Sequence, residues 1–398
     1  MTDIMRLFLE PTSVAVIGVP RATGPDAYNI VENMLDAGFS GTIYPINPRA
    51  GEILGIKAYS SILDIDGEID LAVIMIARAE VPRVVWECVR KDVKAITIVT
   101  QGFADADDEG KRLQAEVLQI ARRNGTRIVG PNSWGTANPF RNFTSGFTPL
   151  VLQKHPIGLI AQTGFYAGQS QMAGKFLDLG NTCDIGFSEG LEYFENDPET
   201  KIVFLHIEGI KNGREFVKAA SRLSKKKPII ALKVGRGEQG AKAAISHTGN
   251  LAGRDEIYEA AFRQCGIIRV SEICEFPDLA KALLNLPLIR GPRVGVITST
   301  GGAGMMTIDI LEKHGLRLAQ LSSAALDRMS AIAPPWQSLG NPADMWAASM
   351  IEGHPLNEVV FTALDSMLQD DNVDAVMLLF PAFIVAGGNE SRLLDICM

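Results

Sequence analysis

The sequence predicts an α/β protein whose parallel sheets are doubly wound, with helices on both faces of each sheet. Three observations predict this class. Short apolar runs alternate with segments of helical periodicity along nearly the whole chain. Most of these runs are continuously apolar, as expected for strands that are buried on both faces. The chain has 398 residues, which is too many for one hydrophobic core, so we expect two or three domains.

The composition excludes several classes of protein. With 46% apolar and 21% charged residues, the chain is typical of a globular protein. A net charge of −8 argues against binding to nucleic acid through phosphate neutralisation. No apolar run reaches the roughly 18 residues of a membrane-spanning helix, and no signal-peptide pattern is present, so we expect a cytoplasmic protein. The five cysteines are scattered without CxxC spacing, which predicts neither a zinc site nor a disulfide framework.

The first block, residues 1–142, contains five expected strands at residues 13–18, 42–48, 69–76, 95–100 and 127–130, with helices at 26–37, 81–91 and 107–124. In such a sheet, ligands bind beyond the carboxyl ends of the strands. The first turn reads Gly18-Val-Pro-Arg-Ala-Thr-Gly24, which is not the dinucleotide fingerprint GxGxxG.

The second expected strand ends in Asn47-Pro-Arg49, where a binder of NAD has an acidic residue. An arginine suits a phosphate better than a ribose diol. The block therefore predicts a site for a phosphorylated nucleotide other than NAD. The alternative is that Arg21 and Arg49 are solvated surface charges.

The second block, residues 150–287, begins with a strand at 157–161 that runs into Gln162-Thr163-Gly164 and a helix expected to reach about residue 179. Free backbone N–H groups at such a strand–turn–helix start can hold an anion, and Thr163 adds a hydroxyl. Further strands are expected at 200–207, which carries Glu208 at its end, and at 228–234. The strand-end rule brings this turn, Gly180-Asn181, Glu208 and the loop after residue 234 to one crevice.

That loop holds His247 between small and hydroxyl residues, in Ala241-Lys-Ala-Ala-Ile-Ser-His-Thr-Gly-Asn-Leu-Ala-Gly253, just before an expected helix at 254–265. Such permissive backbone suits a loop that approaches a ligand. A histidine there can be a nucleophile, a proton carrier or a metal ligand, and a neighbouring carboxylate can fix one ring nitrogen. The alternative is an ordinary exposed loop histidine.

The third block, residues 290–398, carries a strand at 293–299, a glycine turn at 300–304, a helix at 305–314, a helix at 356–368 and a strand at 375–380. A further strand at 316–321 is less distinct. Two or three strands are few for a self-sufficient sheet. We therefore expect the protein or its assembly to continue beyond Met398.

Nine short motifs at these positions give the chain a family resemblance. It resembles the NDP-forming acyl-CoA synthetases, the superfamily of succinyl-CoA synthetase and ADP-forming acetate–CoA ligase, and is similar to their α subunit or α-like half. The motifs are Ser13-Val-Ala-Val-Ile-Gly18, Ile46-Asn-Pro48, Gly130-Pro-Asn132, Ala161-Gln-Thr-Gly164, Leu179-Gly-Asn181, Asp197-Pro-Glu-Thr200, Ile207-Glu-Gly209, Lys226-Lys-Pro228 and Ser246-His-Thr-Gly249.

The resemblance implies a Rossmann-like CoA-binding domain followed by two flavodoxin-like domains, the last one incomplete. His247 would be phosphorylated during turnover, and Glu208 would hold its imidazole. The implied phosphate-binding residues are Gln162, Thr163, Gly164, Gly180 and Asn181. The implied CoA-binding residues are Gly18, Val19, Pro20, Arg21, Asn47, Pro48, Arg49, Ile76, Ala77, Thr100, Gln101 and Asn132.

The implied reaction interconverts acyl-CoA, ADP and phosphate with free acid, CoA and ATP, through an acyl phosphate and phosphohistidine. The chain has no Walker A motif and no recognisable ATP-grasp domain. ATP, ADP and Mg²⁺ would therefore be bound by an ATP-grasp β subunit or fused domain, in a homo- or hetero-oligomer without nucleic acid or membrane. No metal site is expected in this chain.

The chain departs from the family pattern at several positions. Ala77 and Ser133 are mild changes from proline and cysteine. Phe165 and Tyr166 follow the phosphate turn where relatives have small residues, so they either reshape the acyl site or block it. The alternative function is therefore a CoA-binding regulatory or scaffolding protein on the same fold.

Overall fold

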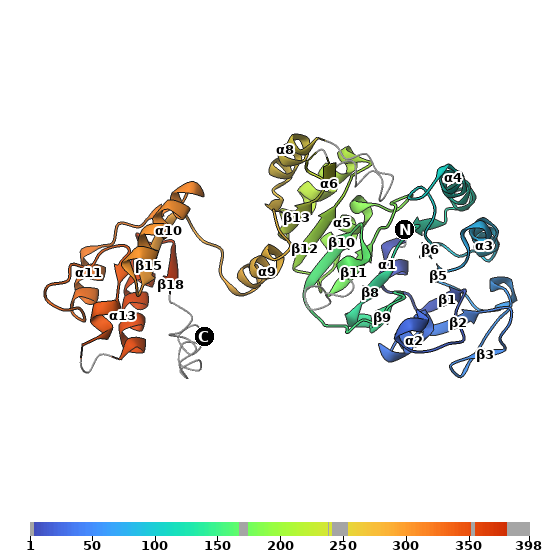
Figure 1. Ribbon diagram of the computed structural model, residues 1–398, viewed down its shortest axis with the longest axis horizontal. Coiled ribbons are helices and arrows are strands. Elements are labelled where there is room, and N and C mark those ends of the chain that lie inside the picture. Colours follow the sequence, from blue (N-terminus) through green and yellow to red (C-terminus); the bar gives the residue numbers. More distant parts are fainter. Residues whose placement is uncertain (1–3, 167–173, 238, 241–253, 352–354, 380–398) are drawn as a thin grey trace. The chain divides into compact units, whose positions relative to one another are not determined.

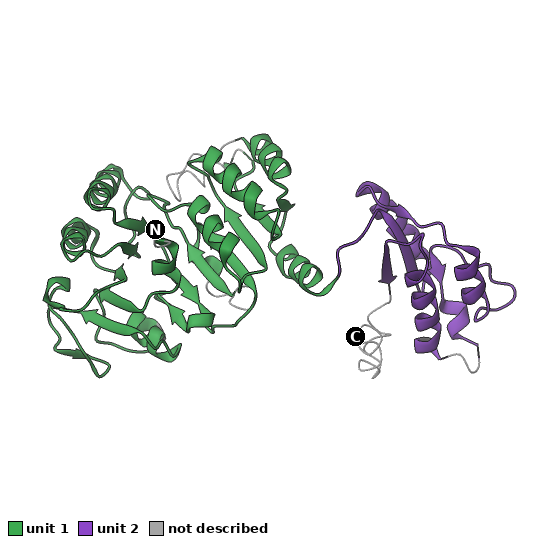
Figure 2. Cartoon of the chain, turned by 180° about the vertical axis from the view of Figure 1, so that it is seen from behind, with its two compact units in different colours: residues 1–286 green, residues 287–398 purple. Residues whose placement is uncertain are grey.

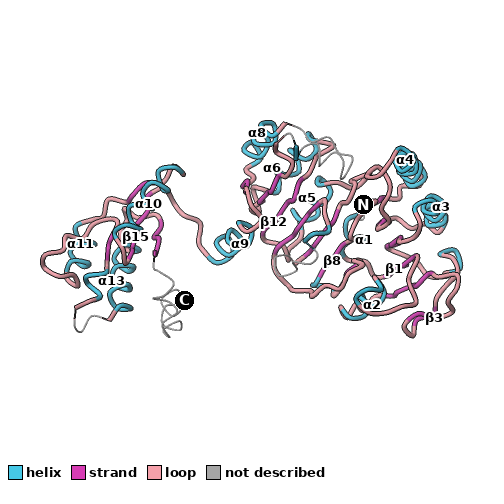
Figure 3. Tube along the Cα trace, in the orientation of Figure 1, coloured by secondary structure: helices cyan, strands magenta, loops and turns pink. Residues whose placement is uncertain are grey.

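The computed structural model describes residues 4–166, 174–237, 239–240, 254–351 and 355–379. The chain divides into two compact units, Met1–Leu286 and Pro287–Met398 (Figure 2). Strands alternate with helices through both units, as the sequence predicts (Figure 3). His247 lies outside the described residues.

The first sheet of unit 1 has five parallel strands in the order β2-β1-β5-β6-β7. Figure 1 labels β2, β1, β5 and β6 of this sheet. The strands are β1 (Ser13–Ile17), β2 (Thr42–Ile46), β5 (Leu71–Ile74), β6 (Ala95–Ile98) and β7 (Arg127–Val129). The helices beside them are α2 (Ile30–Asp36), α3 (Val81–Arg90) and α4 (Asp108–Arg122), and β3 (Glu52–Ile53) pairs with β4 (Ile56–Lys57) in a hairpin. All five predicted strands are confirmed. The expected helix at 26–37 is shorter, because the Asn29 side chain caps it by accepting from Val31 N–H and Glu32 N–H.

Alternate residues of the central strands face opposite sides of this sheet. Val14 and Val16 of β1 belong to a core with Met34 of α2, whereas Ala15 and Ile17 belong to a core with Val84 of α3. Period-two alternation with apolar residues on both faces is what helices on both sides require. The sheet is therefore doubly wound, as the sequence predicts.

The second sheet has seven strands in the order β14-β13-β12-β10-β11-β8-β9. The strands are β8 (Thr136–Asn138), β9 (Phe143–Thr144), β10 (Ile157–Ala161), β11 (Lys175–Asp178), β12 (Ile202–Ile207), β13 (Ile229–Lys233) and β14 (Ile268–Val270). The five strands from β10 to β14 pair in parallel, and β8 pairs antiparallel with β11 and β9. The prediction of a helix as far as residue 179 is wrong, because β11 occupies the segment before it. The expected first domain, residues 1–142, contributes β8 to this second sheet.

Helices α1 (Ile4–Leu9), α5 (Phe187–Asn196), α6 (Gly213–Leu223), α8 (Asp255–Cys265) and α9 (Glu275–Asn285) complete unit 1. One continuous core joins α1, α2 and the first sheet to α5, α6, α8 and the second sheet. Phe276 of α9 stacks on Phe204 of β12 in another core, with ring centroids 4.5 Å apart. The shared core explains why the two sheets form one compact unit.

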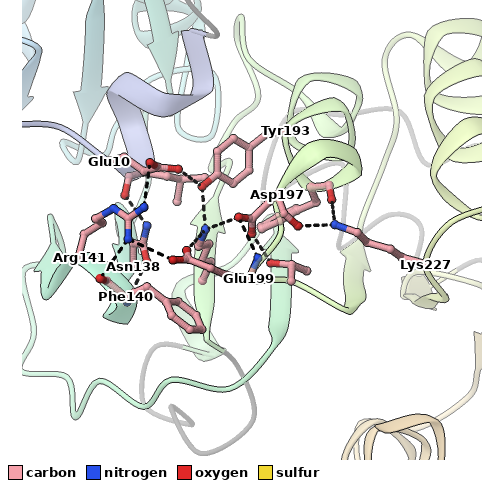
Figure 4. Close-up of polar contacts among 12 residues, drawn as sticks. Glu10, Asn138, Phe140, Arg141, Tyr193, Asp197, Glu199 and Lys227 are labelled. Carbon is pink, nitrogen blue, oxygen red and sulfur yellow. Dashed lines mark hydrogen bonds and ion pairs between the residues drawn. The ribbon is translucent and has the colours of Figure 1, made fainter.

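A buried ion network fastens α1 and the chain after β8 to the second sheet (Figure 4). Lys175 is fully buried at the start of β11, and its Nζ lies 2.7 Å from carboxylate oxygens of both Asp197 and Glu199. Lys175 also donates to Tyr193 Oη at 3.0 Å, and Tyr193 in turn donates to Glu10 at 2.7 Å. Buried charges of this kind require such partners.

Unit 2 holds a smaller sheet in which β16 (Arg317–Leu318), β17 (Ala343–Asp344) and β18 (Ala375–Leu379) each pair in parallel with β15 (Arg293–Thr298). Its helices are α10 (Gly301–Lys313), α11 (Ser323–Ser330), α12 (Trp346–Ser349) and α13 (Leu356–Leu368). The described sheet thus has four strands, and β17 was not predicted. The predicted glycine turn at 300–304 is wrong, because Gly301 already begins α10, with the Thr300 hydroxyl accepting from Ala303 N–H at 3.2 Å.

Candidate functional site

The predicted CoA-binding residues lie at the carboxyl edge of the first sheet, and short hydrogen bonds connect their turns. Gly18 donates to Ile46 O at 3.1 Å, and Asn47 Nδ2 donates to Val19 O at 2.9 Å. Gly18 has φ +92°, and a Cβ there would lie 2.1 Å from Met75 O. Only glycine fits this close approach between β1 and β5.

Hydrogen bonds also join the turns that follow β5, β6 and β7 at the same edge. Thr100 Oγ1 accepts from Ile76 N–H at 3.1 Å and donates to Ile76 O at 2.8 Å. Asn132, with φ +58°, donates its backbone N–H to Thr100 O at 3.0 Å. The structure therefore brings these predicted residues together on one continuous edge, and Pro20, Pro48, Ala77 and Gln101 lie in the same turns.

Two predicted cations of this edge, Arg21 and Arg49, are exposed, and neither forms an ion pair with another described residue. Arg49 N–H donates to Asn47 Oδ1 at 2.8 Å, which fixes the backbone of its turn. Exposed guanidinium groups that no described carboxylate neutralises suit a ligand that carries phosphates.

The side chain of Gln162 connects several segments of the second predicted site. It is 1% exposed, and its Oε1 accepts from Glu208 N–H at 2.8 Å and Gly209 N–H at 3.0 Å. Its Nε2 donates to Gly209 O at 2.9 Å and to Thr182 Oγ1 at 3.1 Å. Both ends of the side chain are thus used within the protein. Any contact of Gln162 with a phosphate would come from its backbone, a distinction that sequence motifs do not make.

The rest of the turn packs against Trp134, which lies two residues after the predicted CoA-site residue Asn132. A Cβ at Gly164 would lie 2.9 Å from Trp134 Cβ, so the turn needs glycine here. The Thr163 hydroxyl accepts from Phe165 N–H at 3.2 Å. Trp134 was not predicted, and its position between the two predicted sites results from tertiary packing alone.

Gly180 and Asn181 lie on the side of the crevice that faces the first sheet. Gly180, with φ +50°, leaves no room for a Cβ, which would lie 2.3 Å from Pro131 O. Asn181 is fully buried, and its Nδ2 donates to Asp105 at 2.6 Å and to Gln114 at 3.1 Å. The Asn181 side chain therefore contacts the first sheet's loops and helix α4. Its Oδ1 is a buried acceptor without a partner among the described residues.

Glu208 directly follows β12, the strand that pairs with β10. It is 6% exposed, and the Gln162 bridge holds its backbone beside β10. Lys233 occupies the end of neighbouring β13, opposite Ile207 in register, and is 1% exposed. Burial lowers the pKa of Lys233, whereas Asp255 and Glu208 act to raise it. Sequence reasoning missed this lysine, because a lysine at the end of an apolar run predicts an exposed strand end.

A cavity of about 220 Å³ lies beside these strand ends, between the turn after β11, the start of α5 and the chain after β12. Lys211 borders it and donates to Asn181 O at 3.0 Å and Thr182 O at 2.9 Å. Burial lowers the pKa of Lys211, and burial raises the pKa of the neighbouring Cys183 thiol to about 12. Cys183 is therefore a neutral thiol near neutral pH.

The described residues contain neither a helix that could span a membrane nor a group of three or more potential metal ligands. His206, the histidine of β12, is 8% exposed and packs against Tyr166 with ring centroids 5.3 Å apart. His247 lies outside the described residues, so the described part of the site consists of the turn, Glu208 and the crevice around them.

Comparison with known proteins identifies the family. Models described as a CoA binding domain and a succinyl-CoA ligase-like flavodoxin domain match residues 12–139 and 154–283. The chain is 39% identical over 386 residues to ADP-forming acetate–CoA ligase II of Archaeoglobus fulgidus, covering 94% of this chain and 57% of that protein. It is 38% identical over 380 residues to the α subunit of the corresponding ligase of Pyrococcus furiosus, covering 94% of this chain and 81% of that subunit.

A solved structure gives the same result. The dinucleotide-forming acetyl-coenzyme A synthetase 1 of Candidatus Korarchaeum cryptofilum, in complex with phosphate and ADP, is similar at a TM-score of 0.86 and 31% identity, covering 100% of this chain and 87% of that chain. The chain thus spans little more than half of the Archaeoglobus relative and most of the Pyrococcus subunit. Together with the two sheets and their strand-end turns, these matches show that the chain belongs to the NDP-forming acyl-CoA synthetase superfamily, within the group of ADP-forming acid–CoA ligases.

Proposed function

We propose that this chain is the α component of an NDP-forming acid–CoA ligase. The enzyme interconverts acyl-CoA, ADP and phosphate with the free acid, CoA and ATP. Phosphate displaces CoA from the acyl group to give an acyl phosphate, and His247 then takes the phosphoryl group and releases the acid. An ATP-grasp β subunit or fused domain binds the nucleotide with Mg²⁺ and accepts the phosphoryl group from His247.

The observation that carries this proposal is the Gln162 bridge. One buried side chain, at the start of the proposed anion-binding turn after β10, accepts from the backbone N–H groups of Glu208 at 2.8 Å and Gly209 at 3.0 Å, which follow β12. A nucleophilic imidazole needs one unprotonated nitrogen, so the other nitrogen needs a fixed acceptor. Glu208 suits that role, and its charge stabilises the imidazolium that forms as the ring nitrogen takes up the phosphoryl group.

The carboxyl edge of the first sheet fits CoA. CoA carries a 3′-phosphate and a diphosphate, which match the exposed Arg21 and Arg49, two cations without an ion pair in the described part of the chain. The close-packed turn at Gly18 allows the ligand to approach the backbone. We assign the phosphate groups of CoA to these turns and its thiol end to the side of Asn132. Trp134, two residues further along the chain, contacts Gly164 of the proposed phosphate turn.

Phosphohistidine formation tests the proposal. The chain, an ATP-grasp partner, Mg²⁺ and γ-labelled ATP should give an acid-labile, base-stable label that disappears in His247→Ala. Glu208→Gln should slow labelling about 100-fold, whereas His155→Ala, a histidine change outside the site, should not. Label that persists in His247→Ala would show that another residue carries the phosphoryl group.

The alternative, a CoA-binding regulatory or scaffolding protein, is favoured by the exposed Phe165 beside the phosphate turn, because a large side chain there can obstruct an acyl site. That function predicts CoA binding without any labelling of His247 in the presence of the partner. The same labelling experiment therefore decides between the two functions.

A further inference from the structure

Two aromatic residues follow the phosphate turn, and the structure places them differently. Their rings form a T-shaped pair with centroids 5.5 Å apart and an interplanar angle of 84°. Tyr166 is 5% exposed and belongs to a hydrophobic core together with Trp134 and Phe176. Phe165 is 60% exposed. Of the two, Phe165 is therefore the one available to a ligand, and Tyr166 contacts its ring edge to face.

The backbone under Phe165 is well fixed. Its N–H donates to the Thr163 hydroxyl at 3.2 Å, and Gly164 rests on Trp134, where no Cβ would fit. The ring is also oriented by its edge-to-face contact with Tyr166. A ring that is held in place in the free protein loses little conformational entropy when a ligand packs on it. Phe165 thus presents a preorganised apolar surface directly after the turn.

The position matters because of the chemistry of the proposed function, on which this inference rests. In an acyl phosphate, a single oxygen joins the carbonyl carbon to phosphorus, so the acyl body begins within about 3 Å of the phosphate. If the turn at Thr163 and Gly164 holds the phosphate, the next side chain lies within reach of the acyl body. That side chain is Phe165.

We propose that Phe165 is a specificity-determining residue that selects carboxylic acids with an aromatic body over acetate. An aryl group packs on the exposed ring in an edge-to-face or offset arrangement, whereas a methyl group covers little of it. Tyr166 has a structural role only: burial raises the pKa of its hydroxyl, which therefore stays neutral near neutral pH.

Binding of acyl-CoA thioesters to the isolated chain tests this inference without a partner subunit. Calorimetry with phenylacetyl-CoA, acetyl-CoA and CoA should show phenylacetyl-CoA binding roughly three- to tenfold more tightly than acetyl-CoA. Phe165→Ala should remove this preference and leave the affinity for CoA unchanged. Phe165→Tyr, which retains a ring, should keep the preference, as should Tyr166→Phe, the matched change at the buried neighbour.

The outcomes separate this inference from the proposed function. Failure of all three ligands to bind contradicts the CoA site itself. Normal CoA binding with equal affinities for the two thioesters, or a preference that survives Phe165→Ala, overturns the inference and leaves the ligase proposal intact. Tighter acetyl-CoA binding by Phe165→Ala, without a loss of phenylacetyl-CoA affinity, would show that Phe165 obstructs the site and would also overturn the inference.

Discussion

At the scale of single residues, Gln162 shows how one side chain can hold two parts of a site. Its amide connects β10 to the backbone of Glu208 and Gly209 and to Thr182, and nothing in its place could make all four contacts except another amide. We therefore assign Gln162 to positioning Glu208, and the proposed phosphate contacts of the turn to backbone groups and Thr163.

Gln162→Leu tests this role. The change leaves two buried N–H groups and one carbonyl without partners, so we expect the free energy of unfolding to fall by about 2–4 kcal/mol. Labelling of His247 should fall further than the loss of stability explains, whereas CoA affinity should be retained. Urea unfolding and calorimetry measure these effects. Gln119→Leu, at an exposed position of α4, is the control and should change stability by less than about 0.5 kcal/mol; equal effects would contradict the bridge.

Arg49 permits a second test at the residue scale. Because it is exposed and has no ion pair within the described residues, its charge is available to a CoA phosphate. Arg49→Ala should weaken CoA binding about two- to tenfold, with a smaller effect at high salt. Arg123→Ala removes the same charge from the exposed carboxyl end of α4 and should have no effect. If both variants bind CoA like the unaltered chain, Arg49 is a solvated surface charge.

At the scale of elements, apolar patterning predicted the strands that are buried on both faces and failed for β11. Lys175 and Asp178 bound this strand, and their charges made the segment look like part of a helix. Both are buried because distant groups satisfy them: Lys175 has Asp197 and Glu199, and Asp178 accepts from Trp134 N–H at 2.6 Å. Such partners depend on the folded topology, so local sequence cannot reveal them.

The ion network around β11 is open to a direct test. Lys175→Met leaves the buried Asp197 without its cation, whereas Glu199 keeps its ion pair with Arg141, so we expect a loss of about 3–5 kcal/mol in the free energy of unfolding. Lys226→Met breaks a half-exposed pair with Glu195 and should cost less than about 1 kcal/mol. Chemical denaturation of both variants measures the difference, and similar costs would mean that the network contributes no more than a surface pair.

At the scale of the whole molecule, the strand-end rule predicted the site better than it predicted side-chain roles. It correctly gathered Gly18, Asn47 and Thr100 on one edge, because parallel strands present all their carboxyl ends on the same side. It could not show that the Asn181 side chain faces Asp105, since that contact depends on how the two sheets of unit 1 pack. His247 and its role stay predictions.

The division into two units predicts separate unfolding transitions, and Asp374 can identify the one that belongs to unit 2. Its carboxylate accepts from Arg293 Nε, Nη2 and backbone N–H, each at 2.9 Å, and these bonds lower its pKa to about 2. The pKa in the unfolded chain is near the ordinary value of about 3.9. Because the folded value is the lower one, the contact stabilises unit 2 fully above about pH 4, and this stabilisation is lost as the pH falls towards about 2.

Asp374→Asn should therefore lower the melting temperature of one transition by a few degrees at pH 7 and leave the other unchanged. The difference from the unaltered chain should shrink as the pH falls from about 4 to about 2, because the native carboxyl is then protonated as well. Scanning calorimetry at several pH values measures both effects, and Asp327→Asn, at an exposed position of α11, is the matched control. A difference that stays constant with pH would attribute the loss to altered packing, since residue 374 titrates in this range in the unaltered chain and not in the variant.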